Sequence, residues 1–226
     1  MNLDEYEKLN PRCTVRCGDV DVVYMTPTLA TKWRVDTLFE KEPVTLEWIA
    51  TFQPGEILVD IGANVGMYTI WAARTRGARV YAFEPESLNF ALLNRNIVAN
   101  GLETQVIAYC AAISERSGFG ALHLSQFMAG GSCHSLDEKL DPFHRPSRPV
   151  YTQGCVSASL DDLVRAGRVP RPQYIKIDVD GFEPKVIRGA AEPRRAGTVR
   201  SLLIGVNQNL PDHLEIVREP VSLAFR

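Results

Sequence analysis

Three acidic residues end apolar segments that are typical of buried strands: Asp60 in LVDIGANVG, Glu84 in VYAFEPE and Asp178 in YIKIDVDG. In an open parallel sheet, such strand ends meet at one edge, and ligands bind there. A carboxylate at this edge can accept hydrogen bonds from hydroxyl groups, take up a proton or hold a metal ion. We therefore expect the three side chains to lie near one ligand site.

The glycines of the first segment indicate how a ligand would approach. Gly62 permits close approach of the backbone, and Gly66 opens a helix whose first N–H groups lack partners. Glu84 ends the next strand, where a carboxylate is placed to accept hydrogen bonds from both hydroxyls of a ribose. Together these features predict a nucleoside-binding site.

Two further residues bear on the kind of nucleoside. A dinucleotide site prefers Gly-x-Gly-x-x-Gly, which cradles a pyrophosphate, whereas this turn carries Asn64 within Gly-x-Asn-x-Gly. Asp60 would repel a pyrophosphate but not a cationic ligand that carries an amino group. S-adenosylmethionine has a sulfonium, an α-amino group and a ribose, so it fits better than NAD. An NAD-dependent oxidoreductase is the less favoured reading of the same fold, and the absence of Gly-Lys-Ser/Thr excludes a P-loop.

The hydrophobic pattern around these residues predicts an alternation of strands and helices. We expect strands at residues 57–62, 78–84, 104–113, 173–181 and 200–207, and helices at 67–76, 87–101 and 183–190, with a strand turning into a helix at 156–167. This order indicates an α/β fold with a doubly wound, mostly parallel sheet and helices on both faces.

The remaining segments suggest how the chain is organised. Residues 1–44 form an N-terminal extension with a strand at 19–25, and residues 45–226 form the ligand-binding domain, which begins with a helix at 45–52. An insertion at about 114–156 carries a short strand at 120–125 and a long loop at 126–150. This loop, with Arg145 and Arg148, is a candidate substrate lid. After a helix at 210–220 and a strand at 221–225 the chain stops, so we expect a shortened C-terminal sheet edge that a second copy could cover.

The composition is that of a globular protein, with 226 residues, 45% hydrophobic and 23% charged. A net charge of −2 gives no reason to expect nucleic acid or an anionic membrane as partner. No apolar run approaches the roughly 18–20 residues of a membrane-spanning helix, and the polar N-terminus is unlike a secretory signal. These features favour a cytoplasmic protein.

The five cysteines have irregular spacing, which favours free thiols in a reducing compartment. Cys13 and Cys17 could form half of a zinc site, with Cys133, His134 and His123 as the other candidates. Buried free thiols are the favoured interpretation.

Four blocks of the sequence resemble the FkbM-type S-adenosylmethionine-dependent methyltransferases: LVDIGANVGMYTIWAA, VYAFEPESLNFALLNRNI, SLDDLV and YIKIDVDGFEPKVIRGA. They occur in the right order, and the resemblance covers about residues 40–207. It implies a Rossmann-like class I methyltransferase fold, S-adenosylmethionine as cofactor, and O-methylation of a hydroxyl on a sugar, glycan or secondary-metabolite acceptor.

The resemblance also implies roles for single residues. The methionine end of the cofactor would meet the turn after the first strand, the ribose would meet the end of the second, and the adenine would lie beyond it. An acidic position in KEPVTLEW would close over the cofactor. The residues expected to bind the cofactor are Glu42, Asp60, Gly62, Asn64, Gly66, Glu84, Pro85, Ala111, Ala112 and Asp178.

The motif KIDVDG carries the catalytic candidates. Asp178 ends the fourth strand, which lies nearest the methyl group in this fold, and Asp180 would share its face if the strand continued. A hydroxyl acceptor needs a base or a metal ion, and these two carboxylates could serve as either, although no metal is predicted. Lys176 alternates with Asp178, so we expect it to pair with an acid or to position an acceptor group.

Some residues depart from the family pattern. The family usually has a glutamate in place of Asp180, and tends to have another where this chain has Gly205. With the short C-terminal edge, these departures leave open a non-catalytic binding protein that keeps the fold. His123, His134 and His144 are interpreted as surface histidines rather than as bases.

Overall fold

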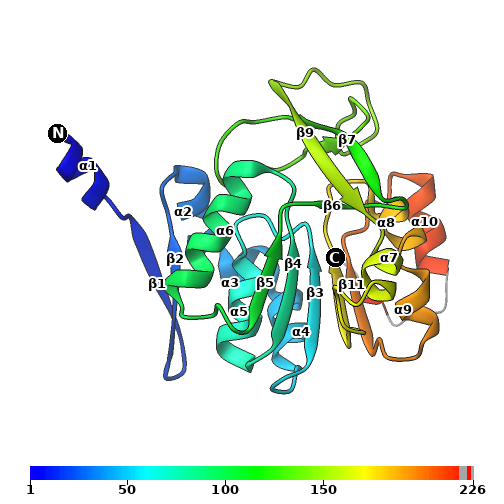
Figure 1. Ribbon diagram of the computed structural model, residues 1–226, viewed down its shortest axis with the longest axis horizontal. Helices are drawn as coiled ribbons and strands as arrows, with labels where there is room; N and C mark the ends of the chain where they lie inside the picture. Colours follow the sequence, from blue (N-terminus) through cyan, green and yellow to red (C-terminus); the bar gives the residue numbers. More distant parts are fainter. Residues whose placement is uncertain (219–222, 225–226) are drawn as a thin grey trace.

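The computed structural model describes residues 1–218 and 223–224, and a six-stranded sheet forms its centre (Figure 1). The strand order is β12-β11-β10-β3-β4-β5, and all neighbouring strands are parallel. The order reverses between β3 and β10, which is the switch point of a doubly wound α/β fold. The strands are β3 (Ile57–Ile61), β4 (Arg79–Phe83), β5 (Val106–Tyr109), β10 (Tyr174–Ile177), β11 (Ser201–Ile204) and β12 (Leu223–Ala224).

Successive side chains of each strand point to opposite faces of the sheet, so each face has its own core. Leu58 and Val80 belong to the cluster that packs under α4 (Pro43–Ala50), α5 (Met67–Arg76) and α6 (Ser87–Ala99). Their neighbours Val59 and Tyr81 belong to the cluster on the other face, with α7 (Leu160–Arg165), α8 (Glu183–Arg188) and α10 (Pro211–Arg218). A short helix, α9 (Ala191–Arg195), follows α8. The predicted two-sided α/β fold is therefore confirmed.

A second sheet lies beyond the carboxyl ends of the central strands (Figure 1). Its order is β6-β9-β7-β8, with β6 (Ala112–Ile113), β7 (Gly118–Leu124), β8 (Ser135–Leu136) and β9 (Tyr151–Ala158). β7 pairs antiparallel with both β8 and β9. The insertion at 114–156 thus contributes most of this sheet, and the single strand expected at 104–113 is two strands, β5 and β6, in different sheets.

Part of the N-terminal segment, from β2 (Val20–Met25) onward, packs into the main core. The segment contains α1 (Leu3–Lys8), an antiparallel hairpin of β1 (Arg12–Cys17) and β2, and two helices, α2 (Leu29–Asp36) and α3 (Leu38–Lys41). Val22 and Tyr24 of β2 are fully buried in the cluster under α5 and α6. The Tyr24 hydroxyl donates to the carbonyl of Met67 at 2.8 Å, which ties the hairpin to the start of α5.

Several element boundaries differ from those expected. β10 ends at Ile177 rather than at residue 181, because Asp180 and Gly181 adopt positive φ angles of 54° and 109° that no strand accommodates. β9 begins at Tyr151, directly after the expected loop at 126–150 and five residues before the strand expected from residue 156, and α2 was not predicted. The expected helix at 210–220 is present at 211–218, and residues 223–224 of the expected final strand form β12. The rest of both predicted elements lies outside the described residues.

The cysteines and helices can be compared with two further expectations. All five cysteines are free thiols, as their spacing predicts, but the expectation that they are buried holds only for Cys155, and Cys110 is exposed. In the described ranges, no helix combines the length and the hydropathy that crossing a bilayer would require.

Candidate active site

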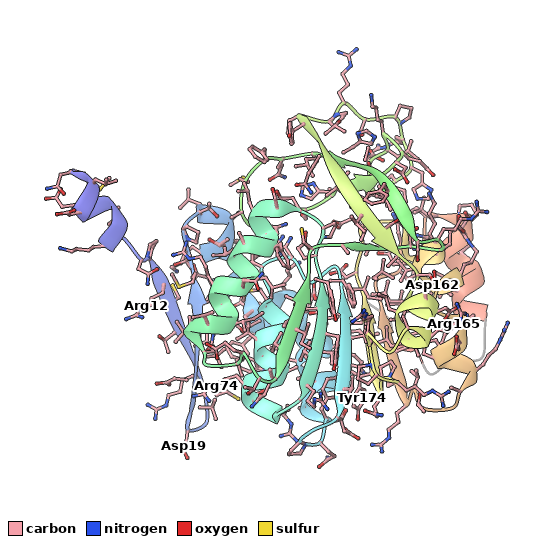
Figure 2. All side chains as sticks on the ribbon, in the orientation of Figure 1. Arg12, Asp19, Arg74, Asp162, Arg165 and Tyr174 are labelled. Atoms are coloured by element: carbon pink, nitrogen blue, oxygen red, sulfur yellow. The ribbon has the colours of Figure 1, made fainter. Side chains whose placement is uncertain are left out.

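A cavity of about 280 Å³ lies at the carboxyl edge of the central sheet. Tyr174, the first residue of β10, marks the opposite edge in Figure 2. A hollow of about 40 Å³ shares part of the lining and reaches Tyr68 and Lys176. The lining includes nine of the residues expected at the site: Glu42, Gly62, Asn64, Glu84, Pro85, Ala111, Ala112, Asp178 and Asp180.

Gly62 brings the turn after β3 against the turn after β10. Its φ is +75°, and a Cβ atom there would lie 1.9 Å from the carbonyl oxygen of Asp178. The Asp178 N–H donates to the carbonyl of Ile61 at 3.0 Å, so the two chain segments are in contact. The close backbone approach at Gly62 thus joins two strand ends beside the cavity.

Gly66 packs against a helix and does not line the cavity. A Cβ atom there would lie 2.4 Å from Cδ1 of Leu93 in α6, and its φ is +85°. The geometry therefore does not support a cofactor contact by Gly66.

Glu84 follows β4 and is held by the backbone on both oxygens. Oε2 accepts from the N–H of Asn64 at 2.8 Å, and Oε1 accepts from the N–H of Glu86 at 3.0 Å. The residue is 5% exposed, and burial raises the pKa of its carboxyl to about 7, although these hydrogen bonds oppose the shift. Each oxygen keeps a lone pair, so the fixed carboxylate can accept from two ligand hydroxyls.

Asp60 lies beneath the cavity and not in its wall. It is 1% exposed, its Oδ2 accepts from the Thr69 hydroxyl at 2.6 Å, and its Oδ1 accepts from Lys176 Nζ at 3.1 Å. Asp60 is thus held within the protein and is absent from the lining of the cavity, so the structure does not place it in contact with a ligand. The charge of Asp60 is compensated by Lys176, so it contributes little to ligand discrimination.

Lys176 links Asp60 to the first catalytic candidate. Its Nζ lies 3.9 Å from Oδ2 of Asp178 and 5.6 Å from the centre of the Tyr68 ring. The expectation that Lys176 pairs with an acid is confirmed, and it is 2% exposed. The cation lies where it can hold the Asp178 side chain in place.

Asp178 and Asp180 both line the cavity, but a turn positions them and not a continuing strand. The Asp178 side chain is 31% exposed. Asp180 has φ 54°, and its Oδ2 accepts from the N–H of Cys133 at 2.7 Å. Burial and the neighbouring charge of Asp178 raise the pKa of Asp180. The two carboxyls therefore differ in environment, which suits them to different roles.

Residues 129–134, which we call the strap, cross over the cavity from the second sheet. The Asn64 and Asn89 amides donate to the carbonyl of Gly131 at 2.7 and 3.0 Å. Arg34 of α2 donates to the carbonyl of Gly130 at 3.1 and 2.9 Å. Part of the expected lid is thus attached to three elements around the cavity.

Glu42 lies at the rim of the cavity, before α4. It is 6% exposed and forms an ion pair of 3.1 Å with Lys41, and the hydroxyl of Thr45 donates to it at 3.4 Å. Its place in the lining agrees with the residue expected to cover the ligand.

The three histidines interpreted as surface residues are all engaged in the fold. His123 is 8% exposed and pairs with the hydroxyl of Thr152 at 3.0 Å. His144 donates to the carbonyl of Gly181 at 2.8 Å, and His134 lines the cavity. The surface interpretation is therefore wrong for His123 and His134, because the second sheet encloses both.

A protein-family comparison decides the relationship. A family model described as Methyltransferase FkbM domain matches residues 60–219, which is most of the chain. This chain belongs to the FkbM methyltransferase family. The match contains the strand ends that carry Asp60, Glu84 and Asp178, so the family assignment and the cavity concern the same part of the fold.

Individual relatives of this FkbM family member are more distant. Hexuronic acid methyltransferase AglP from Haloferax volcanii is 28% identical over 160 residues, covering 70% of this chain and 59% of that protein. Methyltransferase sdnD from Sordaria araneosa is 27% identical over 168 residues, 64% of each chain. The crystal structure of methyltransferase FkbM from Methylobacillus flagellatus KT is similar, with 19% identity, a TM-score of 0.46, and coverage of 69% of this chain and 34% of that one.

The chain spans about three fifths of the length of these curated relatives.

The structure of this FkbM family member also contains two buried groups that sequence reasoning missed. Glu183 accepts from the N–H groups of Val179 and Gly181 at 2.9 and 3.0 Å, and burial raises its pKa to about 7. His213 Nε2 donates to the carbonyl of Gly181 at 3.0 Å and lies 3.5 Å from Glu183. Both groups support the turn that presents Asp178 to the cavity. The motif DGFEP signals this role, since a glutamate two residues after a turn glycine can reach back to the turn amides.

In the described part of the chain, no group of three or more His, Cys, Asp or Glu side chains is arranged to hold a metal ion.

Proposed function

We propose that this chain transfers a methyl group from S-adenosylmethionine to a hydroxyl oxygen of a sugar, glycan or secondary-metabolite acceptor. The observation that carries the proposal is the cavity at the switch point, where Glu84 and Asp178 flank the Gly62–Asn64 turn. Membership of the FkbM methyltransferase family supports the same activity.

The residues present fit a cationic, ribose-bearing cofactor. Four carboxylates line the cavity: Glu42, Glu84, Asp178 and Asp180. The cations in the same lining have partners, since Lys41 pairs with Glu42, Lys185 with Glu138, and Arg34 with a strap carbonyl. This charge balance favours a sulfonium and an amino group over a pyrophosphate, and it replaces Asp60 as the reason for that preference.

In this proposal Glu84, Asp178 and Lys176 have separate roles. Glu84 accepts hydrogen bonds from the ribose hydroxyls and so fixes the nucleoside. When bound, S-adenosylmethionine supplies an electrophilic methyl group. Asp178 takes the proton from the acceptor hydroxyl as the oxygen attacks, and Lys176 holds the Asp178 side chain in place. The cavity aligns the oxygen and the methyl carbon, which is the larger contribution to rate.

The acceptor class rests on chemistry and on one relative. AglP is named a hexuronic acid methyltransferase, which supports a sugar acid as acceptor for this chain. A carboxylate base is suited to a hydroxyl whose pKa is near that of water, since such a group does not ionise unaided.

The test combines binding and turnover in matched variants. Calorimetry should show binding of S-adenosylmethionine and S-adenosylhomocysteine but not of NAD. Glu84→Gln should weaken binding about 100-fold, because two hydrogen bonds to a charged group are altered. Asp178→Asn should keep binding within a few-fold and reduce methyl transfer to uronic acids by about 10²–10⁴. Equal loss of binding in the two variants would refute the division of roles, and no binding of either cofactor form by the unaltered chain would refute the activity.

A further inference from the structure

One unpaired polar atom in the structure belongs to the wall of the cavity. In the described part of the chain, three buried side-chain atoms lack a hydrogen-bond partner: Gln105 Oε1, His134 Nε2 and Thr198 Oγ1. Of these three residues, only His134 lines the cavity. Buried polar atoms without partners are rare in native proteins and need an explanation, and a ligand is one.

The hydrogen bonds around His134 determine what its ring can do. The N–H of Ser125 donates to Nδ1 at 3.3 Å. The Ser125 hydroxyl donates to the carbonyl of Ser132, so it does not compete for that nitrogen. Because Nδ1 accepts, the proton of the neutral ring lies on Nε2. Burial lowers the pKa of His134, which favours this neutral form. Neutral His134 therefore has an N–H donor at Nε2 without an acceptor, and it is not suited to act as a base.

The strap connects two ends of the cavity, one beside α6 and one beside the turn after β10. Cys133 lies at the end formed by the turn after β10, since its N–H donates to Asp180. A Cβ atom at Gly131 would lie 3.6 Å from Cε1 of His134, and the carbonyl of Gly131 accepts from Asn89 of α6, the helix that directly follows Glu84 and Pro85. His134 thus lies toward the β4 end, beyond the carboxylate proposed to hold the ribose.

Apolar side chains beside His134 form a slot suited to a flat ring. Leu122, Leu136 and Ala112 belong to one cluster in the second sheet, and all three line the cavity, as does Pro85. A purine needs apolar surfaces for its two faces and polar partners at its edge. The slot supplies the surfaces, and His134 supplies a donor.

We infer that His134 recognises the purine base of the nucleoside ligand: with the base in this slot, a small shift of the ring brings Nε2–H to a ring nitrogen while Nδ1 keeps its bond from the Ser125 N–H. The inference rests on the proposed function, because it takes the ligand to be S-adenosylmethionine. It gives the second sheet a role in choosing the base, and it makes His134 a binding residue that does not touch the transferred methyl group.

The experiment measures binding of S-adenosylhomocysteine by calorimetry to the whole chain and three variants. His134→Leu should weaken binding about tenfold, which is the usual effect of losing one hydrogen bond. His134→Gln keeps an N–H donor and should stay within about threefold of the unaltered chain. His123→Leu is the matched control, because His123 lies in the same sheet outside the cavity lining, and binding should not change.

Analogues of S-adenosylhomocysteine with one base nitrogen replaced by C–H test the contact without relying on a variant. One analogue should bind the unaltered chain about tenfold more weakly than the parent compound, and should lose nothing further in His134→Leu. The empty His134→Leu protein also loses the bond from the Ser125 N–H to Nδ1, so its unfolding temperature should fall slightly, and the analogue comparison is the readout that a purely structural histidine would not move.

The outcomes separate the two proposals. If the unaltered chain binds S-adenosylhomocysteine and His134→Leu binds it equally well, or if every analogue loses the same affinity in both proteins, the inference is overturned and the proposed function stands. If the unaltered chain does not bind the compound, the proposed function fails, and the inference fails with it.

Discussion

Replacing Glu84 by glutamine should reduce the dependence of stability on pH. Burial raises the pKa of this carboxyl from 4.5 to about 7 in the folded chain. Between these values the folded state holds a proton that the unfolded state has lost. The contribution to stability is therefore complete below about pH 4.5 and disappears as pH rises through about 7.

The size of the effect follows from the shift. One pKa unit corresponds to about 1.4 kcal/mol, so a shift from 4.5 to about 7 makes Glu84 contribute roughly 2–3 kcal/mol more at about pH 5 than at about pH 8. The glutamine has no titrating proton, so this difference is absent in Glu84→Gln. Its amide group also leaves one of the two backbone N–H donors unpaired, which lowers stability at every pH. The informative quantity is hence the difference in the free energy of unfolding between the two pH values.

The assay is urea denaturation of the chain and of Glu84→Gln at both pH values, with the exposed Glu103→Gln as control. The control should follow the unaltered chain. Glu183 has a pKa raised to about 7 by the same cause, so Glu84→Gln should keep part of the pH dependence. If the free energy of unfolding changes with pH as much in Glu84→Gln as in the unaltered chain, Glu84 does not take up the proton on folding.

Two other predictions concern the support of the site. Gly62→Ala should cost more than about 3 kcal/mol or prevent folding, because its Cβ would lie 1.9 Å from the Asp178 carbonyl oxygen, whereas Gly55→Ala, with a similar φ of +82° and nothing within 4 Å, should cost only about 1 kcal/mol. Urea denaturation of the two variants compares them, and equal losses would attribute the effect to φ alone. Lys176→Met should destabilise the chain by about 3–5 kcal/mol, because it leaves Asp60 buried without its cation. Adding Asp60→Asn should recover part of this loss in a double-mutant cycle; strictly additive effects would mean that the pair does not interact.

The central fold could be predicted from the sequence because its signals are local. Apolar runs that end at Asp60, Glu84 and Asp178 mark buried parallel strands, and the helical spacing between them marks the crossovers. The second sheet could not be predicted in the same way. β8 has two residues, and β9 pairs with β7 across a long loop, so neither shows a periodic pattern of its own.

Most residues of the candidate site follow from position in the strands, since the carboxyl ends of parallel strands meet at one edge. The exceptions are instructive. Asp60 occupies such an end, yet its side chain turns down to Lys176 and Thr69. The direction of the Asp60 side chain depends on partners from β10 and α5, which are distant in sequence.

The sequence by itself determined the fold class, the sheet edge where the cavity lies, and the carboxylates Glu84 and Asp178 at that edge, because each depends on local hydrophobic pattern and on the geometry of parallel strands. Only the tertiary structure decided which acid is buried in an ion pair, that Asp180 leaves the strand in a left-handed turn, and that His134 reaches the cavity. These outcomes depend on burial and on partners brought together by folding, and no single segment encodes them.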